Sequence, residues 1–84
     1  MIECEPLFDN VEIELDVEPT YGNEEPIYKE TGIVKKIGPE VKYIKVGDWI
    51  GVFPFAVRRI EIEGQRFHLI PEEKTFTPAK FKKS

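Results

Sequence analysis

The sequence is poor in the side chains that build covalent crosslinks and metal sites. Its 84 residues include one cysteine, Cys4, and one histidine, His68. A single cysteine excludes a disulfide within the chain and fits a reducing compartment, where we expect Cys4 to be a small half-buried side chain. One histidine and no Gly-containing Asp/Asn loop leave no recognisable zinc or calcium site. We therefore expect no metal and no cofactor.

Long apolar runs are also missing. No stretch approaches the ~18 consecutive apolar residues of a membrane helix, and the first residues, MIECEPLF, lack the basic and then apolar order of a secretory signal. The net charge of −4 argues against nucleic acid as a partner, and the basic end at residues 78–84 is expected to be a solvated tail. These features predict a cytoplasmic protein with neither a membrane nor a nucleic-acid partner.

Helical periodicity is absent, whereas strand-like alternation is frequent. The run LFDNVEIELDV, residues 7–17, places valine, isoleucine and leucine on one face and acidic residues on the other. Because several such runs are separated by turn residues, we expect an all-β fold, a small and partly closed barrel of about five strands in a single domain of residues 1–84. The other strands are expected at residues 32–38, 49–53, 57–62 and 66–70.

A long polar stretch interrupts this pattern after the first strand. Residues 18–31 read EPTYGNEEPIYKET, in which prolines, a glycine and an asparagine disfavour regular structure. Loops of this length are uncommon in compact domains and are usually functional or disordered. We therefore expect a mobile loop over residues 18–31, with Ile27 and Tyr28 as apolar side chains within it.

Catalytic groups are few, so we do not expect an enzyme. His68 should alternate with Phe67 and Leu69 on its strand and so face solvent or a neighbouring subunit, and no Ser or Cys nucleophile lies in a recognisable motif. An aromatic platform for single-stranded nucleic acid is an alternative, but most of the aromatic residues fall on the apolar phase of their strands, which favours a core role. Those aromatic residues are Phe8, Trp49, Phe53, Phe55 and Phe67.

Taken in order, PLFDNVEIE, the long loop, GIVKKIGPE, IKVGDWIGV and the final hairpin resemble the GroES-type co-chaperonins. The resemblance covers about residues 6–75. It implies a ring of seven barrels, a homo-oligomeric heptamer, that caps a GroEL-type chaperonin and assists ATP-dependent protein folding, with the chaperonin supplying the nucleotide chemistry. The matching positions are Pro6, Leu7, Asp9, Val11, Gly32, Val34, Ile37, Gly38, Val46, Gly47, Asp48, Ile50 and Val52.

The same resemblance implies that the loop binds the chaperonin through a short apolar segment. We assign Pro26, Ile27 and Tyr28 to that segment. The Gly-Ile-Val sequence at residues 32–34 is an alternative, but it would leave too few residues for the second strand before the break at Pro39. An alternative function for the same fold is a structural or virion assembly subunit without chaperonin activity.

Overall fold

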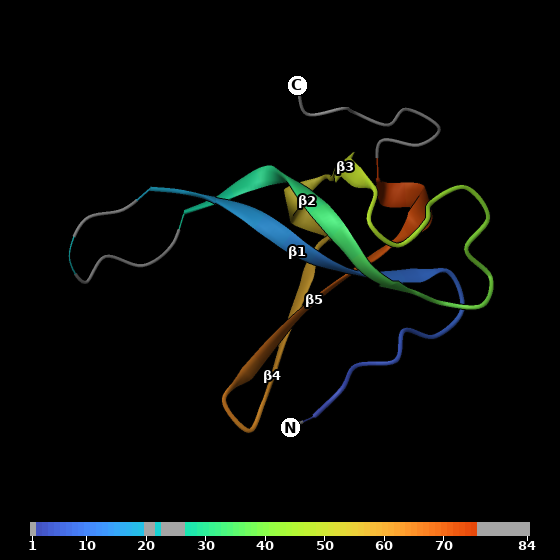
Figure 1. Ribbon diagram of the computed structural model, residues 1–84, viewed down its shortest axis with the longest axis horizontal. Helices are drawn as coiled ribbons and strands as arrows, with labels where there is room; N and C mark the ends of the chain where they lie inside the picture. Colours follow the sequence, from blue (N-terminus) through green and yellow to red (C-terminus); the bar gives the residue numbers. More distant parts are fainter. Residues whose placement is uncertain (1, 20–21, 23–26, 76–84) are drawn as a thin grey trace.

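A computed structural model of the chain describes residues 2–19, 22 and 27–75. Five antiparallel strands form one sheet in the order β3-β2-β1-β5-β4, so that β1 is central and β3 and β4 are the edges (Figure 1). The described residues contain no α-helix, and the predicted all-β class is confirmed. The elements are β1 (Asn10–Glu18), β2 (Ile27–Ile37), β3 (Trp49–Gly51), η1 (Pro54–Ala56), β4 (Arg58–Ile62), β5 (Gln65–Pro71) and η2 (Glu72–Lys74), where η denotes a 3₁₀ helix.

The sheet is curled but is not closed into a barrel, so the predicted closure is wrong. Backbone pairing between Val52 and Thr75 brings the chain after β3 next to the chain after η2, but it is an isolated bridge. Closure would need a longer seam, and β3 has only three residues. The other edge strand, β4, lies in a hairpin with β5 that extends away from β3 (Figure 1). Within residues 2–19, 22 and 27–75, no further strand therefore covers either edge.

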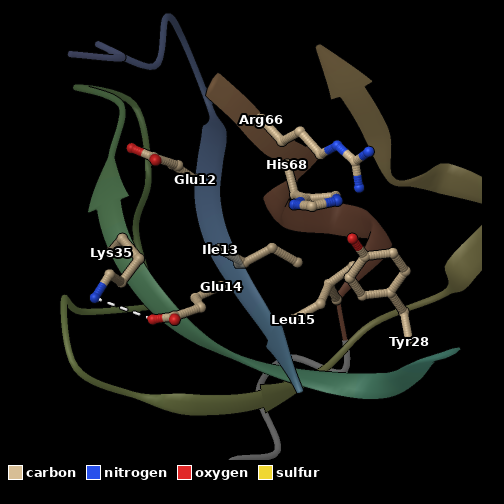
Figure 2. Close-up of a pocket in the computed structure, with 8 residues that line it drawn as sticks. All are labelled: Glu12, Ile13, Glu14, Leu15, Tyr28, Lys35, Arg66 and His68. Carbon is tan, nitrogen blue, oxygen red and sulfur yellow. Dashed lines mark ion pairs between the residues drawn. The ribbon is translucent and has the colours of Figure 1, made fainter. Parts of the chain in front are cut away.

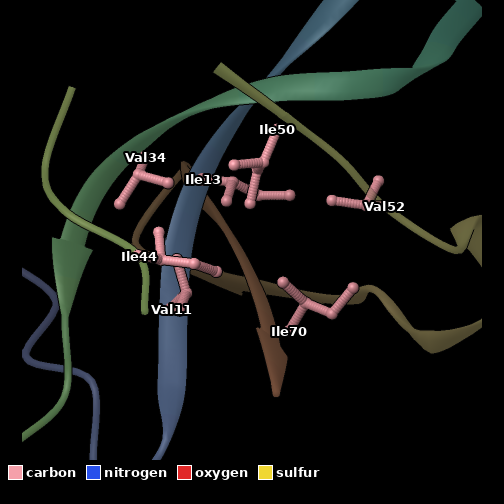
Figure 3. Packing of buried hydrophobic residues seen from close by; sticks show 7 residues of the cluster. All are labelled: Val11, Ile13, Val34, Ile44, Ile50, Val52 and Ile70. Atoms are coloured by element: carbon pink, nitrogen blue, oxygen red, sulfur yellow. The ribbon is translucent and has the colours of Figure 1, made fainter. Parts of the chain in front are cut away.

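A small aliphatic core fills the concave side of the sheet (Figure 3). The alternation in the first strand predicts the burial of Val11 and Ile13, and both are buried. Leu15 only packs against the edge of this core, and Val17 is exposed, so the second half of β1 leaves the core. The core cluster consists of Val11, Ile13, Val34, Ile44, Ile50, Val52 and Ile70.

The aromatic residues contribute little to the core, contrary to the prediction. Phe67 is buried, but Phe8, Phe53 and Phe55 are exposed, Phe55 by 82%. The reason is local geometry, because strand alternation does not continue through these positions. Phe8 lies in a turn with a positive φ of 57°, and Phe53 and Phe55 flank Pro54 at the start of η1. β-branched and aliphatic residues fill the interior instead.

The segment between β2 and β3 is held by a buried carboxylate. Glu72, the first residue of η2, is only 7% exposed. Its Oε2 accepts hydrogen bonds from the backbone amides of Tyr43 (2.7 Å) and Ile44 (3.1 Å), and its Oε1 accepts one from the amide of Lys42 (3.0 Å). These bonds provide acceptors for backbone amides that no neighbouring strand pairs in the described part of the chain. They also fix the position from which Ile44 enters the core.

Candidate functional site

The outer halves of β1 and β2 form a projection, which we call the arm: residues 15–18 of β1 and 27–32 of β2. At its base, Thr31 and Gly32 also pair with Gly51 and Ile50 of β3. Leu15 pairs with Gly32, and a register shift follows before Val17 pairs with Tyr28. The arm extends beyond the core and ends at the connection formed by residues 19–26 (Figure 1).

The arm corrects the predicted boundaries of the loop. The sequence places a loop over residues 18–31, whereas Glu18 ends β1 and residues 27–31 already belong to β2. The polar run Lys29–Glu30–Thr31 was interpreted as loop because composition alone does not show that β1 offers it a partner strand. The connection between the strands is therefore limited to residues 19–26.

The three residues predicted to bind a partner have different positions. Pro26 lies outside the described residues. Ile27 is the first residue of β2, pairs with Glu18 and is 54% exposed. Tyr28, in contrast, is half-buried and contacts β5 of its own chain. The structure thus separates the predicted pair into an exposed apolar side chain at the end of the arm and a neighbouring aromatic side chain that is directed back to β5.

Tyr28 packs against His68, which corrects the expectation that His68 faces solvent or a neighbouring subunit. The two rings meet edge to face, with centroids 5.1 Å apart and an interplanar angle of 61° (Figure 2). His68 pairs with Ile13 in the sheet register and therefore shares a face with the edge of the core. Its Nε2 atom is buried, and among the described residues it has no hydrogen-bond partner.

Burial and charged neighbours shift the pKa values of the basic side chains beside this contact. Burial lowers the pKa of His68, and the nearby Arg59 and Arg66 lower it further. The Tyr28 hydroxyl and then Glu61 raise the pKa of Arg66, whose Nε lies 3.3 Å from Glu61 Oε2. His68 is therefore held in its neutral form, which can pack against an aromatic ring without a desolvated charge.

A cavity of about 360 Å³ lies beside the Tyr28–His68 contact (Figure 2). Its charges are largely paired, since Lys35 Nζ lies 3.1 Å from Glu14 Oε2 and Arg66 pairs with Glu61. The described lining contains no serine or cysteine side chain. The lining consists of Glu12, Ile13, Glu14, Leu15, Tyr28, Lys35, Arg66 and His68.

On the other side, an aspartate fixes the arm to the edge of the sheet. Asp16 Oδ2 accepts hydrogen bonds from Thr31 Oγ1 and from Trp49 Nε1, both at 2.7 Å. These bonds connect β1, β2 and β3, because the three residues come from three adjacent strands. The alternation in residues 7–17 places Asp16 on the acidic face of its strand, but its bridging role depends on long-range register that the sequence pattern does not reveal.

Cys4 is a half-buried free thiol, as predicted, and burial followed by the charge of Glu12 raises its pKa against the opposing effect of Lys36. Such a thiol is a weak nucleophile.

Among residues 2–19, 22 and 27–75, no group of three or more His, Cys, Asp and Glu side chains could hold a metal ion. Within the same residues, no helix has the length and apolar character needed to cross a membrane.

No protein-family model matches the chain, and no curated protein matches it.

Proposed function

We propose that this chain is a co-chaperonin: one subunit of a ring that caps a GroEL-type chaperonin, binds it through the end of the arm and assists ATP-dependent folding without nucleotide chemistry of its own. The observation that carries the proposal is the arm itself. It projects from the core, is held by the contact of Tyr28 with His68 and by the hydrogen bonds of Asp16, and presents Ile27 exposed at the start of β2.

The energetics of such an arm suit a reversible cap. Burying the exposed part of one isoleucine contributes at most about 1.5–3 kcal/mol, and the ordering of a binding segment offsets part of that gain. One arm should therefore bind weakly. Several arms on one ring raise the effective concentration of the remaining arms, so that the ring binds firmly while each contact stays easy to break.

Within the predicted segment, the proposal assigns different roles to Ile27 and Tyr28. Ile27 is available as an anchor, because more than half of its surface is exposed. Tyr28 already contacts His68 and faces Arg66. In this proposal Tyr28 positions the arm, and Ile27 enters an apolar groove of the partner.

The substitution Ile27→Asp tests the proposal. A charge at this position would have to be desolvated in an apolar groove, so the variant should lose nucleotide-dependent capture by a GroEL-type chaperonin in a pull-down with purified proteins. Phe55→Asp is the matched control, because it places the same charge on an exposed apolar residue outside the arm and should be captured as well as the parent chain. Capture of the Ile27→Asp variant at the level of the parent would contradict the proposal.

A further inference from the structure

The outer edge of β4 has the features of a pairing surface. β4 is the last strand of the sheet order, and all five of its residues, Arg58 to Ile62, are exposed. In the described part of the chain no strand lies beyond it. Unpaired edges of this kind promote association between chains, and proteins often protect them with charged side chains. The arrangement of the charges therefore decides which partner β4 can accept.

The hairpin turn fixes which backbone groups point outward. Glu63 and Gly64 both have positive φ, 49° and 81°, as a two-residue type I′ turn requires. In such a turn the flanking residues, here Ile62 and Gln65, face each other as a hydrogen-bonded pair. Because hydrogen-bonded and non-hydrogen-bonded pairs alternate along the strands, the backbone N–H and C=O groups of Arg59 and Glu61 are directed away from β5.

An antiparallel second copy of β4 matches these groups in charge as well as in hydrogen bonding. With the two-fold axis at Ile60, Arg59 of each copy lies opposite Glu61 of the other, and the two Ile60 side chains face each other. Registers centred on Arg59 or on Glu61 would instead place like charges opposite one another, which is destabilising. Among the residues of β4, only the register centred on Ile60 gives two opposite-charge pairs and no like-charge pair.

The distribution of charged and apolar side chains on the two faces of β4 is consistent with this register. Arg59 and Glu61 share one face, while Ile60 and Ile62 share the other, where they are 39% and 44% exposed. Pairing would bury part of this apolar face between the copies and would extend the existing Arg66–Glu61 ion pair to Arg59 of the second copy.

We infer that β4 is a self-association edge, through which two copies of this chain join their sheets by antiparallel β4–β4 pairing centred on Ile60. The inference does not rest on the proposed function, because it uses neither the arm nor residues 19–26. The β4–β5 hairpin and the arm extend in different directions (Figure 1), so that one chain could use both.

Disulfide trapping tests this register directly. In a Cys4→Ser background, Ile60→Cys places two thiols in a non-hydrogen-bonded pair with a Cα separation of ~4.5 Å, within the ~4.4–6.8 Å that a disulfide spans. Mild oxidation should give a covalent dimer on a denaturing gel. Ile62→Cys is the matched control, because Ile62 would lie opposite Arg58 and two such cysteines would be about four residues apart, roughly 13 Å. Equal crosslinking of both variants would overturn the inference.

Charge reversal in the Ile60→Cys background gives a second readout. Arg59→Glu should slow crosslinking about tenfold, since two attractive pairs become repulsive, and Glu61→Arg should do the same. The double variant Arg59→Glu, Glu61→Arg should restore the parental rate, because the opposite-charge pairs are re-formed with their positions exchanged. Single reversals that crosslink at the parental rate, or a double variant that stays as slow as the single ones, would overturn the inference. Circular dichroism of each variant checks that the sheet is retained.

Discussion

His68 illustrates how register determines the role of a single side chain. Alternation with Phe67 and Leu69 indicates only that it faces the opposite side of β5, and the sequence offers no means of identifying its neighbours. Those neighbours are Tyr28, 40 positions earlier in the chain, and Arg59 on β4. Its burial beside two arginines follows from the pairing of β5 with both β1 and β4.

The protonation of His68 should make stability depend on pH. Its folded-state pKa is lowered, so below the ordinary value of about 6.5 the unfolded chain binds more protons than the folded chain. The stabilisation is therefore present above that pH and is lost as the pH falls through the folded-state pKa. Because His68 is the single histidine, one imidazole NMR signal should titrate below pH 6.5 in the native protein, and the free energy of unfolding should fall between about pH 7 and 5.

The substitution His68→Gln provides the control for this prediction. It should flatten the part of the pH dependence that lies near the histidine pKa and leave the part due to carboxylates unchanged. A native-state titration at or above pH 6.5, or an identical slope in the variant and the parent, would contradict the assignment of His68 as a neutral packed side chain.

The two glycines of the GIVKKIG stretch, Gly32 and Gly38, lie where a side chain would collide with backbone atoms. A Cβ atom on Gly38 would lie 2.3 Å from the backbone oxygen of Phe8, and one on Gly32 would lie 2.8 Å from the backbone oxygen of Glu14. Both approaches are to backbone atoms and cannot be relieved by a rotamer change. The spacing of the glycines in GIVKKIG thus marks where β2 passes closely over the chain around β1, which the sequence motif alone does not show.

At the level of elements, local sequence patterns predict which strands exist better than they predict where each strand begins and ends. The alternation in β1 and the final hairpin, with its turn at Glu63 and Gly64, are confirmed, because the signals for both lie within a few neighbouring residues. β2 begins at Ile27 rather than at Gly32, and β3 ends at Gly51 rather than at Phe53. These limits depend on whether a partner strand is available, and that is decided by residues far away in the sequence.

Glu72 is the element-scale feature that the sequence interpretation missed. Its carboxylate accepts hydrogen bonds from the backbone amides of Lys42, Tyr43 and Ile44. The substitution Glu72→Ala should therefore leave these buried or half-buried donors without their acceptor. We expect a loss of about 2–4 kcal/mol in the free energy of unfolding, measured by urea denaturation.

The neighbouring residue Glu73 is the matched control for this prediction, because it lies in the same 3₁₀ turn but is exposed. Glu73→Ala should change stability by no more than about 0.5 kcal/mol. Equal effects of the two substitutions would show that the carboxylate of Glu72 does not hold the segment between β2 and β3.

On the scale of the whole molecule, a single chain leaves much apolar surface uncovered. Among the described residues no strand lies beyond β3 or β4, and many large hydrophobic residues are exposed; unpaired sheet edges favour association between chains. The exposed set is Leu7, Phe8, Val17, Ile27, Ile37, Tyr43, Val46, Phe53, Phe55, Ile60 and Ile62. Composition predicts such association in general, because a chain of 84 residues buries little core, but it does not indicate which surface is used.

Native mass spectrometry of the full chain, alone and mixed with a GroEL-type chaperonin and nucleotide, tests the central proposal most directly. Alone, the chain should have a mass that is a multiple of seven chains of 9.8 kDa each. With chaperonin and nucleotide, the chaperonin should gain the mass of at least one such ring and lose it again when nucleotide is removed. A chaperonin whose mass does not change when the chain and nucleotide are added would contradict the account.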